Sequence, residues 1–360
     1  MQLTIINMVM PTKVLFVNSY MRSGIGDFGQ EIRRQITKNA KHELMYIETS
    51  ETWRSFFYVW RCVILFKGKV LLNLGFTVFG KSIFRNLLNF FLIFLVSVFS
   101  PRKISAVLHD SPEITDSENS GYENFRLINA GSRIATEFLR HTKLVVLSVE
   151  LYKVLTVKHK LKRVRFQPFP CSRIPTKKTS NFAKPVLILH VGYISKYKGL
   201  EILPDLKRAL KNKVEIAVIG GIHAVLSRTP IGASYLEKLR SDLGNADIKV
   251  PGYLSESEIQ KIMARNRCIG ILPYRMTSGS SYSAIYLIER GIPVITTDLP
   301  EFLELKRKGG GLITVSRNVN CLLTAIEELM DSETKYDQLL LSNIDYCTKN
   351  SIATLIDNLL

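Results

Sequence analysis

One stretch, residues 185–210, most constrains what this chain can fold into. Residues 185–191 form an apolar, β-branched run with the length of a buried strand, and this run stops at Gly192. Two lysines and a second glycine follow, and then leucine and isoleucine recur at helical spacing. A strand, a glycine loop and a helix in this order form the unit of an open parallel α/β sheet, which binds ligands at the carboxyl ends of its strands.

The two lysines of this loop, Lys196 and Lys198, point to an anion site. A helix that starts after the strand offers unpaired N–H groups and a favourable dipole, and a nearby lysine adds a charge suited to phosphate. Surface lysines in an ordinary solvated loop are the alternative for any single unit of this kind. The motifs elsewhere in the chain decide between the two.

Length and composition favour two globular domains, because the chain has 360 residues of which 46% are hydrophobic. The net charge of +18 is uneven: residues 1–180 carry 27 Lys and Arg against 12 Asp and Glu, and residues 181–360 carry 22 against 19. A basic half can face nucleic acid, an anionic membrane or anionic substrates. The chain lacks zinc-finger spacing, an RNP-type motif and a basic zipper, so no nucleic-acid partner is expected.

Cysteine usage favours a reducing compartment. The five cysteines are scattered, odd in number and free of CxxC pairs, and the first residues lack the pattern of a signal peptide. We therefore expect a cytoplasmic protein, with a peripheral position on the inner face of the membrane as a further expectation. No Asp-rich metal motif is present in the sequence, and no metal or other cofactor is expected.

Strands and helices alternate in both halves, which predicts two Rossmann-like parallel-sheet domains facing a cleft. The expected division is an N-terminal domain over 1–172, a linker over 173–184, a C-terminal domain over 185–345, and a C-terminal helix over 346–360 that packs back on the first domain. Strands are expected at 13–19, 44–47, 69–74, 104–108, 144–147, 164–169, 186–191, 214–219, 248–250, 268–272, 294–297 and 311–315. Helices are expected at 28–40, 53–66, 82–100, 125–139, 149–157, 200–211, 231–243, 255–265, 279–290, 299–308 and 318–330.

Two of these helices, 53–66 and 82–100, are candidates for contact with a membrane surface. The second is very apolar, with a narrow polar stripe of serines and asparagines, and only 16 residues separate Arg85 from Arg102. This is short of the roughly 20 residues that span a bilayer. Either this helix packs on the sheet with its outer face in the membrane interface, or it is a wholly buried crossover helix.

The first half also contains a glycine loop, in which Gly24 and Gly26 follow the first expected strand. Glycines allow a backbone to approach a ligand closely, although a lone G-x-G is weak and a simple tight turn is the alternative.

In order and spacing, these segments resemble the GT-B glycosyltransferases, above all the family-4 group of retaining nucleotide-sugar enzymes (glycosyl transferases group 1). The resemblance covers nearly the whole chain. In the second half it rests on residues 192–199 (G-R-L-x-x-x-K-G in the family), 218–221, 250–259, 271–274 and 291–298, with Glu304 at the later glutamate. In the first half it rests on the glycine loop 23–26 and on Leu108-His109-Asp110.

Three positions depart from the family pattern. Tyr193 stands where the family usually has an arginine, although its lysine is kept as Lys198. Ser278 and Tyr286 stand where the family usually has two glutamates, and Glu289 does not match the missing role. The small-residue loop before Tyr282 still offers N–H groups to a pyrophosphate. These losses leave the identity of the donor open.

The resemblance implies a retaining hexosyltransferase that moves sugar from a nucleotide sugar to a glycan or lipid-linked acceptor, as in polysaccharide or glycolipid biosynthesis. It implies catalytic roles for Lys198, His109 and Asp110, although His109 can also be read as an ordinary buried strand-end histidine. Expected partners are the donor, the acceptor and an anionic membrane surface. The residues expected to bind substrate are Gly24, Gly26, Asn73, Gly192, Tyr193, Gly199, Gly221, Tyr274, Ser278, Gly279, Ser280, Ser281 and Tyr286.

Two other functions fit the same sequence. A non-catalytic adaptor of the membrane surface could have kept the fold, and nucleotide binding would separate it from an enzyme. A sugar-nucleotide epimerase with the same architecture is the second alternative, and product analysis would separate it from a transferase.

Overall fold

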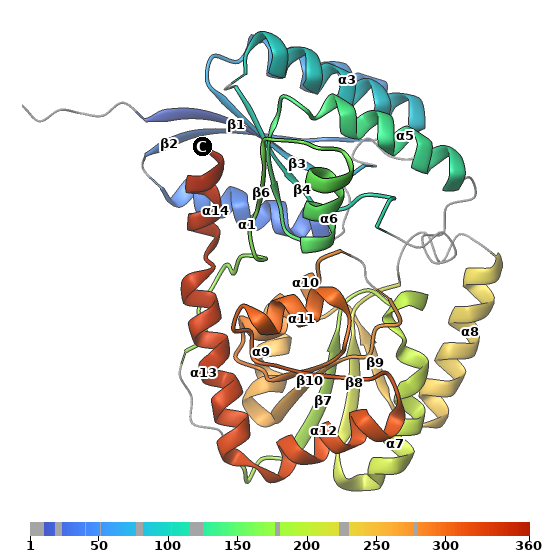
Figure 1. The fold of residues 1–360 in the computed structure, drawn as a ribbon. Coiled ribbons are helices and arrows are strands. Elements are labelled where there is room, and N and C mark those ends of the chain that lie inside the picture. The colour runs from blue at the N-terminus through green and yellow to red at the C-terminus, as the bar shows by residue number, and fades with distance from the viewer. Residues whose placement is uncertain are drawn as a thin grey trace, which may run out of the picture. The chain divides into compact units, whose positions relative to one another are not determined.

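The computed structural model contains two compact units (Figure 1). Residues 1–113, 124–167 and 352–360 form the first unit, and residues 114–123 and 168–351 form the second. The sequence-based prediction ends the first domain at residue 172 and the second at residue 345. In the structure residues 168–184 belong to the second unit, and residues 352–360 belong to the first. The structure describes residues 11–18, 24–39, 41–50, 52–76, 82–101, 103–114, 125–176, 181–222, 230–276 and 279–360.

The first unit is built on a six-stranded parallel sheet with the strand order β2-β1-β3-β4-β5-β6. The predicted strands at 69–74 and 104–108 are confirmed to the residue. Its elements are β1 (Thr12–Asn18), α1 (Gly24–Lys38), β2 (His42–Glu48), α2 (Trp53–Leu65), β3 (Lys69–Leu74), α3 (Ile83–Phe99), β4 (Ile104–Leu108), α5 (Phe125–Phe138), β5 (Lys143–Val146), α6 (Val149–Lys153), a π-helical turn (Val154–Lys158), β6 (Val164–Phe166) and α14 (Ile352–Leu359).

Helices cover both faces of this sheet. In Figure 1, α3 and α5 lie together over one face, while α1 and α14 lie on the other. Phe28, Ile32 and Ile36 are fully buried on one side of α1, as their helical spacing predicts. Because α14 contacts α1, the last helix of the chain completes the core of the first unit.

Helix α3 is built with its polar side inward. Asn86, Asn89 and Ser97 are buried, and the Ser97 and Thr142 hydroxyls form a 2.9 Å hydrogen bond. Large apolar side chains face solvent instead, with Phe84 68% and Phe99 82% exposed. The alternative of a wholly buried crossover helix is therefore wrong. Across the described segments, no helix combines the length and the apolar character that crossing a membrane requires.

The second unit repeats the architecture with a six-stranded parallel sheet in the order β12-β11-β10-β7-β8-β9. Its strands are β7 (Val186–Val191), β8 (Glu215–Ile219), β9 (Lys249–Gly252), β10 (Arg267–Leu272), β11 (Val294–Thr297) and β12 (Leu312–Val315). Its helices are α7 (Leu203–Leu210), α8 (Pro230–Asn245), α9 (Glu256–Arg265), α10 (Tyr282–Ile288), α11 (Pro300–Arg307), α12 (Val319–Asp331) and α13 (Glu333–Lys349), with 3-10 turns at Lys196–Lys198, Leu200–Ile202 and Lys211–Lys213.

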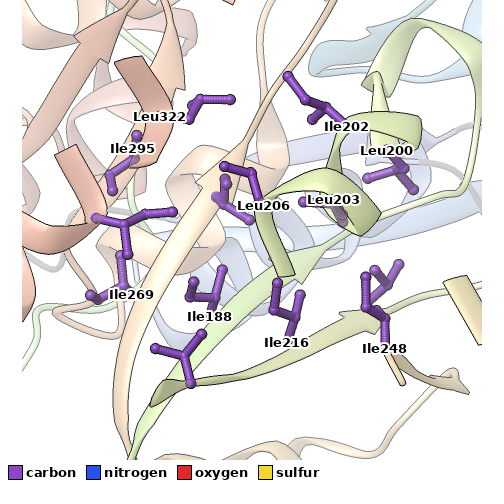
Figure 2. Close-up of a cluster of buried hydrophobic side chains, with 14 of the residues drawn as sticks. Ile188, Leu200, Ile202, Leu203, Leu206, Ile216, Ile248, Ile269, Ile295 and Leu322 are labelled. Carbon is purple, nitrogen blue, oxygen red and sulfur yellow. The ribbon is translucent and has the colours of Figure 1, made fainter. Parts of the chain in front are cut away.

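The core of the second unit lies between this sheet and helices α7 and α12. Figure 2 shows Leu203 and Leu206 of α7 above Ile188 and Ile216 of two neighbouring strands, and all four are fully buried or nearly so. Leu322 of α12 extends the same cluster. Burying each such side chain contributes about 1.5–3 kcal/mol, so the strand that leads to the lysine loop is anchored on a large apolar cluster.

Several sequence-based boundaries need correction, and residues 333–345 of α13 were not expected to be helical. The glycine loop was expected to precede a helix at residue 28, but α1 begins at Gly24 and includes both glycines. The helix expected at 279–290 is only the seven residues of α10. The single C-terminal helix expected at 346–360 is the end of α13 followed by α14, with a break at residues 350 and 351.

Two helical glycines of the first unit provide a matched test of packing. A Cβ on Gly29 would collide with the side-chain amide of Asn18, whereas a Cβ on Gly131 would lie 3.6 Å from its nearest neighbour, Ile83. We expect Gly29→Ala to lower the free energy of unfolding by about 1–3 kcal/mol through overpacking. Gly131→Ala should raise it by about 0.5–1 kcal/mol, because alanine favours the helix. Urea unfolding of both variants checks this, and equal effects would contradict the packing described for α1.

Candidate active site

The loop after β7 is shaped by two glycines with positive φ. Gly192 has φ +130°, and a side chain there would collide with the Ser283 hydroxyl. Gly199 has φ +67°, and a side chain there would collide with the Pro273 carbonyl. Both positions therefore require glycine for backbone reasons and for space. Between them the chain forms one 3-10 turn that carries Lys198 inward and leaves Lys196 exposed.

Lys198 is the central charged group of this loop, with only 5% of the residue exposed. Its ammonium donates hydrogen bonds to the Tyr274 hydroxyl and to Ser283 Oγ, the latter at 3.3 Å, and lies 3.9 Å from the Tyr274 ring centroid. Burial lowers the pKa of Lys198 to about 7, although the negative charge of Glu301 acts in the opposite direction. The side chain is thus poised between its charged and neutral forms near neutral pH.

Tyr274 is fully buried beneath this lysine. Its hydroxyl lies 3.1 Å from Ser281 Oγ, and its ring meets the Phe302 ring edge-on at 5.1 Å between centroids. Burial raises the pKa of Tyr274, so the phenol keeps its proton. A side chain with no exposed surface cannot contact a substrate, so the direct substrate binding expected of Tyr274 does not agree with its position.

The loop before α10 brings Ser281 to the Tyr274 hydroxyl. Gly279 in this loop has φ +93°, and the Ser281 hydroxyl accepts a hydrogen bond from the Ala284 N–H at 3.3 Å. Ser280 is half-buried, and the expected binding residue Ser278 lies outside the described residues. Lys198 and Ser281 both contact the Tyr274 hydroxyl, while a diphosphate site at this position stays a prediction.

Tyr193 and Gly221 lie at the same carboxyl edge of the sheet. The Tyr193 ring meets the Tyr253 ring edge-on at 5.9 Å, and a side chain on Gly221 would collide with the Tyr253 ring. The position where relatives have an arginine thus contributes an aromatic ring to a small cluster and no positive charge.

Tyr286 lies in a separate ion-pair cluster. Its hydroxyl donates to Glu256 at 3.3 Å, and the Arg290 guanidinium lies 3.3 Å from its ring centroid. Arg290 and Arg173 both bind the Glu256 carboxylate, at 2.5 and 2.9 Å. The hydroxyl proton of Tyr286 is used in the hydrogen bond to Glu256. If Tyr286 contacts the ribose of a nucleotide sugar, its hydroxyl oxygen can therefore act only as an acceptor. Glu289 is buried and accepts from the Ser172 N–H, so it does not supply a missing carboxylate.

The first unit carries a buried polar network at the carboxyl edge of its own sheet. Asn73 is fully buried and donates to Asn18 Oδ1 at 2.7 Å and to the Ile25 carbonyl at 2.8 Å. Asn18 donates to the Gly26 carbonyl at 3.2 Å. The two asparagines therefore hold the first turn of α1, including Gly24 and Gly26, against the sheet. Asn73 itself is a structural residue here and not the substrate contact that was expected.

This network fixes the tautomer of His109. Asn73 uses its amide nitrogen as a donor, so its oxygen accepts the 2.6 Å hydrogen bond from His109 Nε2. Burial lowers the pKa of His109 to about 3, so the ring is neutral and its Nδ1 carries the lone pair. Asp110 accepts the Phe76 N–H at 3.2 Å, and burial raises the pKa of its carboxyl group. A buried, neutral and hydrogen-bonded His109 fits the ordinary strand-end residue as well as a catalytic one, so its catalytic role stays a prediction.

Three residues that contribute to the Lys198 cluster or to the Asn73–His109 network were not predicted from the sequence. Ser283 binds the lysine, and its place just after the run of small residues from 277 to 281 is a signal that could have included it. Asn18, the last residue of β1, holds α1, and its position at a strand end is the only signal for it. Glu301 influences the charge of Lys198 from α11, which no local pattern indicates.

Comparison with known proteins assigns a class to this arrangement. Residues 173–340 match the family described as glycosyl transferases group 1. No curated protein sequence matches the chain. Among solved structures, HepE from Anabaena in complex with UDP-glucose is 12% identical with a TM-score of 0.68, covering 97% of this chain and 98% of that one.

Two other solved structures have the same fold. Sucrose-phosphate synthase from Thermosynechococcus elongatus is 11% identical with a TM-score of 0.70, covering 97% of this chain and 98% of its own. The lipopolysaccharide outer core galactosyltransferase WaaB is 12% identical with a TM-score of 0.60, covering 96% and 98%. The two six-stranded units thus form the GT-B fold. Together with the match of residues 173–340, this fold supports a glycosyltransferase whose second unit carries a glycosyl transferases group 1 domain.

The buried lysine yields a prediction for stability. The pKa of Lys198 is about 7 in the folded protein against an ordinary 10.5, so the unfolded chain binds more protons between these values and stability rises with pH there. Lys198→Met removes a desolvated charge and should raise the free energy of unfolding by about 1–4 kcal/mol at pH 6. Urea unfolding at pH 6 and pH 10 should show a smaller gain at pH 10. The exposed Lys196→Met is the matched control, and equal effects of the two substitutions would contradict the burial of Lys198.

Proposed function

We propose that this protein is a retaining glycosyltransferase that takes a nucleotide sugar as donor and a membrane-proximal glycan or lipid-linked acceptor. The observation that carries the proposal is the Lys198 ammonium, held by Tyr274 and Ser283 in the loop after β7 of a glycosyl transferases group 1 domain. Retention is what the family resemblance implies. Neither the adaptor nor the epimerase alternative is favoured by the comparisons.

The chemistry explains why a charge belongs at this position. The diphosphate leaving group gains negative charge as the bond to the sugar breaks, so a fixed cation stabilises the transition state more than the bound donor. In this proposal Lys198 supplies the cation, while the backbone at Gly279 and the Ser281 hydroxyl supply hydrogen-bond donors. The neutral His109 offers its Nδ1 lone pair to a sugar hydroxyl, and Asp110 orders the chain beside it.

Helices α2 and α3 support the membrane-proximal acceptor. The apolar surface of these helices, defined here as Phe57, Ile64, Leu65, Phe84 and Phe99, is exposed, and each side chain has more than half of its surface in solvent. The Trp53 and Phe84 rings lie 6.3 Å apart, so the two helices present a joint surface. Exposed clusters of this kind are typical of protein or membrane contact sites.

Charge favours an anionic membrane as the partner of this apolar surface. Between Glu51 and Asp110 the sequence contains eight Lys and Arg and no Asp or Glu. Arg85 of α3 lies over the Trp53 ring at 5.0 Å, and Lys103 donates to the Ile64 carbonyl at 3.0 Å, so basic groups lie directly beside the exposed rings. Aromatic rings flanked by cations without acids suit an interface with anionic lipid headgroups.

The donor site is tested by ligand-induced stabilisation and by transfer. A panel of nucleotide sugars, with UDP-glucose first because the HepE structure contains it, should include one that raises the melting temperature of the protein. A ligand at 100 times its dissociation constant adds about 2.7 kcal/mol. Lys198→Ala should abolish most of this stabilisation and lower turnover by about 10²–10³, as the loss of one charge-stabilising donor does.

Lys196→Ala is the matched control, because this lysine is exposed two residues earlier in the same turn. Its donor binding and turnover should remain close to wild type. If the two alanine variants behave alike while both remain folded, the assignment of the diphosphate to Lys198 is wrong.

Membrane association is tested with vesicles. The protein should sediment with phosphatidylglycerol vesicles and less with neutral ones, and salt should weaken the difference because surface attraction decays over about 8 Å at physiological ionic strength. Phe57→Ser with Phe84→Ser should weaken vesicle binding by about tenfold or more through lost apolar burial. Leu341→Ser removes an exposed leucine of the second unit and serves as the control. Equal binding to neutral and anionic vesicles would rule out the electrostatic contribution.

A further inference from the structure

A chain of hydrogen bonds runs from the lysine loop to the start of α10. The Lys198 ammonium can only donate, so the Tyr274 oxygen accepts its hydrogen bond. The Tyr274 and Ser281 hydroxyl oxygens lie 3.1 Å apart, and Ser281 Oγ accepts the Ala284 N–H at 3.3 Å. Ser283 Oγ accepts a second N–H of Lys198 at 3.3 Å. The Tyr274 hydroxyl therefore links the lysine to the first turn of α10.

Gly192 keeps side chains away from this cluster, since a Cβ there would collide with Ser283 Oγ and lie 3.8 Å from Lys198 Nζ. The ammonium and the Ser283 hydroxyl thus border a stretch of backbone that tolerates no side chain. A cation beside a hydroxyl group suits a phosphate oxygen.

We propose that Tyr274 is a positioning residue for the donor diphosphate: its hydroxyl holds the Lys198 ammonium in place next to the first turn of α10. The inference rests on the proposed function and extends it to a residue that never contacts substrate. Tyr274 is fully buried, and its ring is fixed edge-on by Phe302 at 5.1 Å and by Tyr197 at 5.7 Å. The hydroxyl consequently has one orientation, set by its two polar partners.

A purely structural tyrosine would not need its hydroxyl in contact with a cation. Tyr336 illustrates the structural case, because it is also buried in the second unit and its hydroxyl donates to the Cys268 backbone carbonyl at 2.9 Å. Tyr274 instead accepts from Lys198, so removing its oxygen removes a group that stabilises the charged form of the lysine. The proton affinity of Lys198 is therefore a direct readout of the proposed role.

The other titratable groups that face Lys198 do not reverse this expectation. Glu301 of α11 favours the charged lysine, and the Tyr197 ring centroid lies 5.0 Å from its Nζ. His190 of β7 is neutral, because burial and the nearby Lys198 charge lower its pKa to about 3. None of these groups is changed by removing the Tyr274 hydroxyl, so the pKa of Lys198 should fall below its value of about 7.

The experiment compares Tyr274→Phe with wild type in two assays. In carbon NMR titrations of protein labelled at lysine Cε, the Lys198 resonance, assigned by its absence in Lys198→Ala, should have its midpoint lowered by about one pH unit, since hydrogen bonds to charged groups are of that strength. The basic limb of kcat/KM for the donor reports the same group in the free enzyme and should move to lower pH by the same amount. Above the midpoint, kcat/KM should fall about tenfold.

Two further variants make the result decisive. If Tyr274→Phe does not fold, Ser283→Ala takes its place. This substitution removes the second acceptor of Lys198 and should shift the Lys198 midpoint in the same direction. Tyr336→Phe should leave both the midpoint and the donor kcat/KM unchanged. An unchanged Lys198 midpoint in folded Tyr274→Phe or Ser283→Ala overturns the inference, whatever the donor panel shows. A panel without any binder overturns the proposed function, whereas a donor that binds while the Lys198 midpoint in Tyr274→Phe is unchanged overturns this inference alone.

Discussion

Removing an ammonium group from water is costly unless fixed polar groups replace the hydration shell, and the carboxyl edge of the second sheet is organised around this requirement. Lys198 receives the phenol oxygen and the ring face of Tyr274 and the hydroxyl oxygen of Ser283, which come from two different segments of the chain. Two glycines with positive φ make the approach possible. The apolar cluster under α7 holds the strand rigidly enough for this arrangement to persist.

The first unit meets a similar requirement without a charge. Its sheet edge is held by amide groups, with Asn18 and Asn73 binding carbonyls of the first turn of α1 and fixing the imidazole of His109. A neutral histidine is thus prepared in one unit and a desolvated lysine in the other. In both cases the residues that hydrogen-bond to the functional group are fully or almost fully buried. They are brought to it by contacts between distant parts of the sequence.

The sequence could predict features set by local patterns, but not those set by contacts between distant residues. Strands such as β3, β4, β7 and β11 were located to the residue, because buried parallel strands are continuous apolar runs between glycines and charges. The lysine loop followed from the same local pattern. The helical start at Gly24 and the burial of Tyr274 depend on partners 48 and 76 residues away in sequence. The polar stripe of α3 was recognised, but periodicity alone cannot tell which face of a helix meets the sheet.

Helix α14 gives the chain an order of assembly. The polypeptide leaves the first unit after residue 167, builds most of the second unit with residues 168–351, and returns with residues 352–360. Ile352, Leu355, Ile356 and Leu359 fill the core beneath the first sheet, and Asn358 binds Gln167 at 3.0 Å. The first unit therefore cannot complete its core until residues 352–360 have been synthesised, although most of its chain precedes the second unit. Until then part of the apolar core of this basic, aromatic unit stays open to solvent.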